Sequence, residues 1–286
     1  MKDRENKKRR ATLPVLLAVP AALTAWVYWG NISIGTTRIA VRSEKIPEPF
    51  AGFTIAQVSD LHNAKFGAGQ RRLLTAVRSA SPDIIAVTGD LIDSRRTDVE
   101  VAMEFIRGAV EIAPVYYVTG NHEARMALNK TQAASGEALK AQLQAAGVVM
   151  LDDRAVALSR GGASIRLLGL AAPAYARITG GIGAKLSGLL GTDSEYSILL
   201  SHKPSLFDVY AAAGADLVLC GHIHGGQIRI PFVGGLLNPD IRFFPPYSAG
   251  LYKQGGTQMI VSRGLGNSKL PVRINNRPEL VVITLA

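Results

Sequence analysis

The sequence predicts an α/β domain. Short apolar runs typical of buried strands alternate along the chain with stretches of helical pattern, and each run ends in a polar cluster. All five histidines of the chain fall in these clusters. Because the loops at strand ends are where α/β sheets bind ligands, the same pattern predicts where the functional site lies.

The expected strands are the apolar runs at 53–58, 84–88, 115–119, 165–170, 198–200, 217–220, 259–261 and 280–285. Helical patterns between them cover residues 68–80, 97–110, 136–147 and 204–213. Two segments break the alternation: 171–195 is rich in Ala and Gly, and 231–256 is rich in Gly, Pro and aromatic residues. We interpret both as loops that could cover the site.

The N-terminal region predicts a membrane anchor. Residues 11–30 carry no charge and reach the length of about 20 residues that a helix needs to cross a bilayer. Six basic residues precede this run, and Trp26, Tyr28 and Trp29 lie at its far end, where aromatic rings favour the lipid–water interface. A cleaved signal peptide and a buried core helix are the other interpretations.

The positive-inside rule then assigns the parts of the chain to compartments. Residues 1–10 are predicted as a basic cytoplasmic tail and 11–30 as a single-pass transmembrane signal anchor in the cell membrane. Residues 31–52 are predicted as a short strand-like stretch and a linker, and 53–286 as an extracytoplasmic domain.

Charge and cysteine content exclude several classes of function. The net charge is +10, and residues 1–10 supply +4 of it, from six basic and two acidic residues. No dense basic stripe with interleaved aromatic residues is present, so we do not expect a nucleic-acid partner. The single cysteine excludes an internal disulfide framework and a four-cysteine zinc site.

The strand-end clusters together form a candidate metal site. They hold His62, His122, His202, His222 and His224, with Asp60, Asp90 and Asn121. Imidazole and carboxylate ligands suit Zn, Fe or Mn better than Ca. In the Asp-x-His and His-x-His pairs, residues two apart project to the same face when the chain is extended, so we expect each pair to converge.

These clusters occur in the order D-x-H, GD, GNH[D/E], H and GHxH over residues 60–224. This order resembles the calcineurin-like metallophosphoesterase superfamily. Gly225-Gly226-Gln227 and the glycine-rich stretch 263–267 are similar to its bacterial membrane-associated branch. The resemblance covers roughly residues 52–286. It implies a four-layer sandwich of two packed mixed β-sheets flanked by helices, with residues 53–286 as the metallophosphoesterase domain.

The resemblance also implies a site with two divalent metal ions, Mn, Fe or Zn. Carried over residue by residue, it gives one ion to Asp60, His62 and His224, the other to Asn121, His202 and His222, and both to Asp90 as a bridge. His122 is implied to be the catalytic residue that binds no metal. It would act as general acid or stabilise the pentavalent phosphorus.

The expected function is therefore dinuclear-metal-dependent hydrolysis of phosphate esters, by in-line attack of a water or hydroxide held between the metals. The expected substrate is a phosphorylated small molecule or lipid at the membrane surface: a phosphomonoester, a phosphodiester or a lipid pyrophosphate. The alternative is a non-catalytic scaffold that keeps this fold and binds protein partners. Such scaffolds usually lose a ligand, and this chain retains all of them.

Four further residues near the motifs have less specific interpretations. Glu123 is either a hydrogen-bond partner that orients His122 or an exposed acid. Cys220 is expected to pack in the core. Arg125 and Lys203 are interpreted as surface charges in preference to contacts with substrate phosphate.

Overall fold

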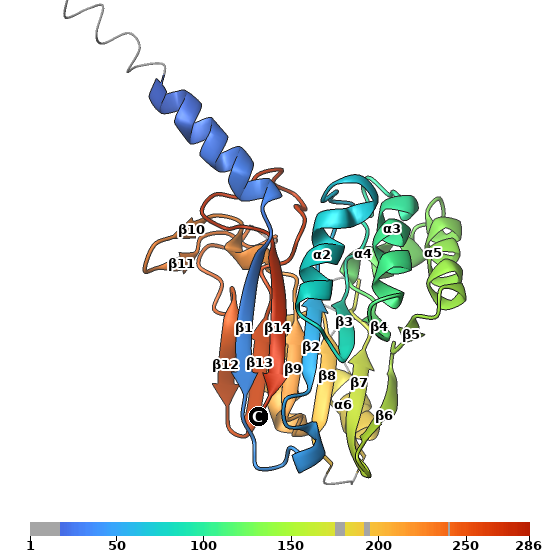
Figure 1. The fold of residues 1–286 in the computed structure, drawn as a ribbon. Coiled ribbons are helices and arrows are strands. Elements are labelled where there is room, and N and C mark those ends of the chain that lie inside the picture. The colour runs from blue at the N-terminus through green and yellow to red at the C-terminus, as the bar shows by residue number, and fades with distance from the viewer. Residues whose placement is uncertain (1–17, 175–180, 192–194, 240) are drawn as a thin grey trace, which may run out of the picture.

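The computed structural model describes residues 18–174, 181–191, 195–239 and 241–286. Within these ranges the chain forms two six-stranded sheets and a small two-stranded sheet of β10 (Arg229–Ile230) and β11 (Gly234–Gly235) (Figure 1). The first sheet has the order β1 (Gly35–Val41), β14 (Glu279–Leu285), β2 (Thr54–Val58), β3 (Ile84–Thr88), β4 (Val115–Val118), β5 (Val149–Met150). The second has the order β12 (Gly250–Gln254), β13 (Thr257–Val261), β9 (Leu217–Cys220), β8 (Ser197–Ser201), β7 (Ala163–Leu170), β6 (Arg154–Arg160).

Both sheets are mixed. In the first sheet β14 is antiparallel to β2, while the other described pairs are parallel. In the second sheet the edge strands β12 and β6 are antiparallel to their neighbours. Strands β3 and β9 are buried along their whole length, and their side chains are apolar except for Thr88, which fits strands buried on both faces.

Three apolar layers hold the sheets and helices together. Between the sheets, Ile55 and Ile283 of the first pack with Ile198 and Leu219 of the second. The first sheet's outer face is covered by α2 (Arg71–Ser79), α3 (Val99–Val110), α4 (Asn121–Leu128) and α5 (Ala133–Ala145). The second sheet's outer face is covered by α6 (Ile182–Leu190) and α7 (Phe207–Ala213). The predicted α/β fold of two mixed sheets flanked by helices is confirmed.

The topology determines which end of the sandwich carries the site. Because β14 is antiparallel to β2, the start of β14 lies at the same edge as the ends of β2, β3 and β4. The start of β1 lies there too, since β1 is parallel to β14. A helix over residues 18–32 runs into β1 and therefore projects from this edge (Figure 1). We call it the site edge.

The helix at 18–32 overlaps the predicted anchor at 11–30, of which residues 11–17 lie outside the described residues. Within the described ranges, no helix has both the length and the apolar character required to span a bilayer.

Residues 31–52, predicted as a short strand-like stretch and a linker, contain β1, which pairs along its length with β14. This range therefore contributes a strand to the first sheet, ahead of residue 53.

Five strands, β5, β6, β10, β11 and β12, and two helices, α4 and α6, were not predicted in the loops and edges of the sandwich. The expected loop at 171–195 contains α6, and the expected loop at 231–256 contains β11 and β12. The edge strand β6 contains four apolar residues at 155–158 but is largely exposed, with only Leu158 buried, and it was not among the expected strands. Helix α4 begins at Asn121, inside the GNH motif, and was not predicted because the motif was interpreted as a polar cluster at a strand end.

Candidate metal centre

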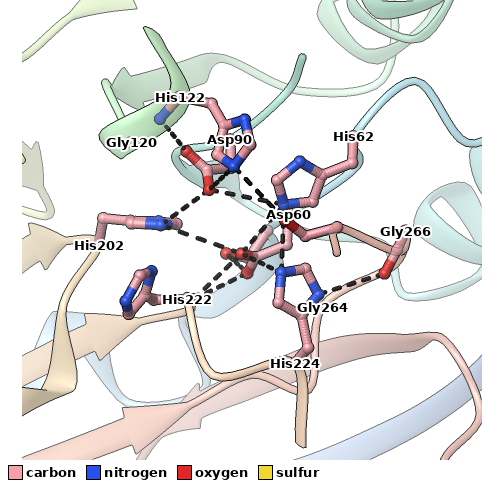
Figure 2. A network of polar contacts seen from close by, with 12 residues as sticks. Asp60, His62, Asp90, Gly120, His122, His202, His222, His224, Gly264 and Gly266 are labelled. Carbon is pink, nitrogen blue, oxygen red and sulfur yellow. Dashed lines mark hydrogen bonds and ion pairs between the residues drawn. The ribbon is translucent and has the colours of Figure 1, made fainter. Parts of the chain in front are cut away.

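All eight predicted site residues meet at the site edge, and Figure 2 labels all of them except Asn121. They follow the ends of strands that are neighbours in space: β2 and β3 in the first sheet, β8 and β9 in the second, and β4 through the start of α4. Parallel neighbours carry their carboxyl ends to one edge, and the two sheets face each other across the core. Distant motifs of the sequence are thereby brought together.

The backbone brings each pair of ligands together by left-handed turns. Asp60 and His62 have φ of 53° and 45°, and His222 and His224 have φ of 72° and 52°. The predicted extended geometry of the Asp-x-His and His-x-His pairs is therefore wrong. Asp90 has a φ of 52° as well. Non-glycine residues in this region cost about 1–3 kcal/mol each, and such strain is typical of functional sites.

Two motif glycines allow the loops to approach the carboxylates closely. A Cβ on Gly120 would lie 2.1 Å from Asp90 Oδ1, and one on Gly221 would lie 2.3 Å from Asp60 Oδ2. With no Cβ in the way, the backbone N–H of His122 donates to Asp90 Oδ1 at 2.9 Å. The backbone N–H of His222 likewise donates to Asp60 Oδ2 at 3.0 Å. The glycines of GNH and GHxH thus serve to seat the two carboxylates.

The first group of donor atoms comes from Asp60, His62 and His224. Nε2 of His62 lies 3.2 Å from Nε2 of His224. Oδ1 of Asp60 lies 3.5 Å from His224 Nε2 and 3.8 Å from His62 Nε2. All three side chains are buried, and their donor atoms point at one another as ligands around one ion do.

The second group comes from Asp90, His202, His222 and Asn121. Nε2 of His202 lies 3.1 Å from Asp90 Oδ2. One end of the Asn121 amide lies 2.8 Å from His222 Nδ1 and 3.2 Å from His202 Nε2. With its oxygen at this end, Asn121 places a third lone pair beside two imidazole lone pairs, an arrangement that a cation stabilises.

Asp90 joins the two groups, because its Oδ2 lies 3.5 Å from Nε2 of His62 as well as 3.1 Å from Nε2 of His202.

Backbone carbonyls orient two of the histidine rings. Nδ1 of His202 lies 2.8 Å from the carbonyl oxygen of Thr88, and Nδ1 of His224 lies 3.2 Å from that of Gly266. A proton on Nδ1 that donates to the carbonyl leaves the Nε2 lone pair facing the site. Metal-binding histidines are commonly fixed in this way.

The buried charges of the site act strongly on one another. Burial alone would raise the pKa of Asp60 and Asp90, but the surrounding histidines hold both well below the ordinary range. Burial alone would lower the pKa of His202, but the carboxylates of Asp90 and Asp60 raise it to about 9. A buried cluster of ionised carboxylates and imidazole lone pairs fits divalent cations.

Comparison with known proteins gives the family. The calcineurin-like phosphoesterase model matches residues 53–226. The uncharacterized metallophosphoesterase YkuE of Bacillus subtilis is 31% identical over 263 residues, with 88% of this chain and 85% of that protein covered. This chain belongs to the calcineurin-like phosphoesterase family. The family predicted from the motif order is confirmed.

One further relative and one solved structure have more specific descriptions. The phosphodiesterase YaeI of Escherichia coli is 28% identical over 247 residues, with 82% of this chain and 83% of that protein covered. A solved dimetal phosphatase from Danio rerio aligns with a TM-score of 0.46 at 14% identity, over 82% of this chain and all of the other. A likeness at that level bears on no individual residue of the site.

His122 lies beside the predicted metal ligands, with one nitrogen engaged. The backbone N–H of Ser94 donates to its Nδ1 at 2.9 Å, so the proton of the neutral ring is on Nε2. Nε2 lies 4.0 Å from Asp90 Oδ2 and 3.5 Å from Ser268 Oγ. Burial lowers the pKa of His122 to about 4, so the ring is neutral at pH 7.

Neither interpretation of Glu123 is correct. Its carboxylate is buried and accepts from the backbone N–H groups of Asp90, Gly120 and Ile92, at 3.0, 2.9 and 3.3 Å. It therefore fixes the GD loop against the GNH loop, and its hydrogen bonds are to backbone and not to the His122 ring.

The other three sequence interpretations, for Cys220, Lys203 and Arg125, have different outcomes. Cys220 is fully buried among apolar side chains, as expected. Lys203 is only 5% exposed, so it is not a surface charge. Arg125 is half-buried and lines the site cavity, and its Nε donates to the carbonyl of Ala174.

Several residues of the site lie outside the motifs. The site cavity, of about 70 Å³, is lined by Arg95, Ser268 and Lys269 as well as by motif residues. Arg273, fully buried, contacts the carbonyl of Gly266 and Nδ1 of His224 at 3.3 Å. Near these residues, the only pattern recognised in the sequence was the glycine-rich stretch at 263–267. That stretch indicated a branch of the family and predicted no contact in the site.

Proposed function

We propose that this chain hydrolyses phosphate esters with two divalent metal ions, Mn, Fe or Zn, at the site edge. The observation that carries the proposal is Asp90 Oδ2, which lies between Nε2 of His62 and Nε2 of His202. One ion would be held by Asp60, His62 and His224, the other by Asn121, His202 and His222, and both by Asp90.

When bound, two such ions withdraw charge from the phosphoryl oxygens and lower the pKa of a water to about 7, which makes it a nucleophile. The protein's part is to fix the ligands and exclude bulk water. The left-handed loops and the carboxylate of Glu123 hold the ligand positions before any ion binds. Such preorganisation avoids rearrangement during the reaction.

His122 has the role of a hydrogen-bond donor. Because Ser94 N–H occupies Nδ1, the available N–H of His122 is on Nε2, next to Asp90 and Ser268. We assign it to the phosphoryl or leaving-group oxygen, whose negative charge grows as the P–O bond breaks. Arg95, Arg125 and Lys269 add positive charge around the cavity, which attracts an anionic phosphate.

We also propose that the chain acts at a membrane surface. Residues 11–30 would form the single-pass anchor, with residues 1–10 in the cytoplasm and the phosphoesterase domain outside. The topology supports this, since the helix over 18–32 projects from the same edge as the site. A phosphomonoester, a phosphodiester and a lipid pyrophosphate are all compatible with the ligand set.

The experiment that tests hydrolysis uses the full chain with Mn²⁺ and nitrophenyl phosphate mono- and diesters. We expect turnover that is abolished by a chelator and by Asp90→Asn, while Leu251→Ala on the edge strand β12 retains it. Turnover that survives both treatments would overturn the proposal. No turnover together with fewer than one ion per chain would favour the scaffold alternative.

A further inference from the structure

A second cavity, of about 150 Å³, adjoins the candidate metal centre. Its apolar walls come from Leu237, Pro239, Ile241 and Leu270. We call it the apolar cavity. Pro239, Ser268 and Lys269 line both the apolar cavity and the site cavity. The two cavities therefore share these three residues in their walls.

Two polar side chains in the wall of the apolar cavity, those of Gln227 and Asn238, are engaged within the protein. The Gln227 amide donates to the carbonyls of Leu270 and Val272, at 3.0 and 2.8 Å. The Asn238 carbonyl group accepts from the backbone N–H of Arg242 at 2.8 Å. These bonds hold the loops in place and leave a surface that suits a hydrocarbon better than a polar ligand.

Charge changes sharply between the two cavities. The site cavity contains the cationic Arg95 and Arg125, and Lys269 lies at the shared wall. None of the described residues that line the apolar cavity is acidic. The sequence of environments, from metal ligands through a lysine to an apolar wall, matches a molecule with a phosphate at one end and a hydrocarbon at the other.

The surroundings of the apolar cavity are also unusually apolar for a protein surface. Ile241 lines the cavity, and Phe243 forms a β-bridge with Leu237 of the cavity wall. Ile241, Phe243 and the next residue, Phe244, are 65%, 67% and 57% exposed. A gathering of exposed large apolar side chains marks an interaction site, and a freely soluble substrate needs none.

We propose that the apolar cavity binds the hydrocarbon chain of an amphiphilic phosphate ester whose phosphate lies at the metal centre. This inference rests on the proposed hydrolysis and specifies its substrate class. The reaction is unchanged: water adds to phosphorus, a P–O bond breaks, and the leaving oxygen takes a proton. The chain contributes to binding by leaving water, which is worth up to about fourfold in affinity per buried methylene.

Two measurements on the full chain in amphipol, loaded with Mn²⁺, test the proposal. The first is kcat/KM for nitrophenyl alkyl phosphates with methyl, butyl and octyl groups, each below its critical micelle concentration. The second is the affinity of methyl-, butyl- and octylphosphonate by calorimetry, which needs no turnover. We expect both to rise steeply with chain length.

Leu270→Asp places a charge in the wall of the apolar cavity and should flatten both dependences on chain length. Leu251→Asp is the matched control, because Leu251 is also 37% exposed and lies on β12, outside the cavity wall. Leu270→Trp fills the cavity without a charge and should flatten them as well.

The outcomes separate this inference from the proposed function. If phosphonate affinity rises with chain length but no ester is hydrolysed, hydrolysis fails and the apolar subsite stands. If esters are hydrolysed with no dependence on chain length, the subsite is overturned. It is also overturned if Leu270→Asp keeps the full dependence, since the chain then binds elsewhere.

Discussion

At the scale of single residues, the site consists of nitrogen and oxygen atoms whose lone pairs face one another at distances of 3.1 to 3.5 Å. Without a cation, such contacts are stabilised only when some of the imidazoles carry protons. Protons and metal ions therefore compete for the same nitrogens, and the competition can be measured.

The strongest competition is expected at His202, whose pKa the carboxylates of Asp90 and Asp60 raise to about 9 against the opposing effect of burial. Below pH 9 a metal ion must displace this proton, so Mn²⁺ affinity should increase by up to about tenfold from pH 7 to pH 8. A metal-competition titration measures this. Affinity that falls over the same interval contradicts the assignment.

The raised pKa of His202 also predicts how the stability of the metal-free chain depends on pH. A histidine whose folded pKa lies above the unfolded value of 6.5 stabilises the fold fully below pH 6.5, and this contribution is lost as pH rises to 9. The urea midpoint should therefore be lower at pH 9.5 than at pH 6. His202→Gln should reduce this difference, and an unchanged difference would refute the raised pKa.

His122 should contribute to turnover and not to metal binding. Because its Nδ1 accepts from Ser94 and its Nε2 N–H is the donor, His122→Asn is expected to lower kcat by about 10²–10⁴-fold. Metal content, measured by elemental analysis, should stay at the wild-type value. Loss of an ion in this variant would make His122 a ligand instead.

At the scale of elements, the buried part of the fold was readable from the sequence and the exposed part was not. Strands β3 and β9 have the predicted bounds, because a strand buried on both faces is a continuous apolar run. Strand β6 lies at an exposed edge where only Leu158 is buried, and its short apolar stretch at 155–158 was not recognised as a strand.

The sequence predicted which residues gather at the candidate site but not the backbone geometry that brings them together. Motif order identified the eight side chains whose donor atoms meet at the site edge, but not the surrounding Arg95, Ser268, Lys269 and Arg273. The extended geometry given as the reason for their convergence was wrong. Residues such as Asp60 and His224 adopt φ values that depend on tertiary contacts with Gly221 and Gly266, which spacing alone cannot reveal. Glu123 was misjudged for the same reason, since its partners are backbone amides of loops distant in sequence.

The role of Gly221, the glycine of the GHxH motif, can be tested by adding a single methyl group. Gly221→Ala would place a Cβ 1.9 Å from Ser59 Oγ and 2.3 Å from Asp60 Oδ2. We expect a loss of about 1–3 kcal/mol in the free energy of unfolding, measured with urea, together with weaker metal binding. Gly256→Ala, with no atom within 4 Å of its new Cβ, is the control and should unfold like the wild type.

At the scale of the whole molecule, the candidate site and the end of the last strand lie at opposite edges of the sandwich. The candidate metal centre, the apolar cavity and the end of the helix at 18–32 share the site edge, while β14 ends at Leu285 on the opposite edge. A fusion after Ala286 therefore leaves the site clear, and it reports on which side of the membrane the domain lies.

We expect an alkaline phosphatase fused after Ala286 to be active in intact bacteria, because the basic residues at 1–10 should remain in the cytoplasm. A β-galactosidase fused at the same point should be inactive. The reverse pattern of activities would place the phosphoesterase domain in the cytoplasm.

The most direct test of the account is the anomalous scattering of Mn²⁺ in crystals of the metal-loaded chain. We predict two peaks about 3.5–4 Å apart, with Asp90 Oδ2 between them and His62 and His202 on opposite sides. A single peak, or two peaks of which only one contacts Asp90, would contradict the dinuclear site from which the proposed chemistry follows.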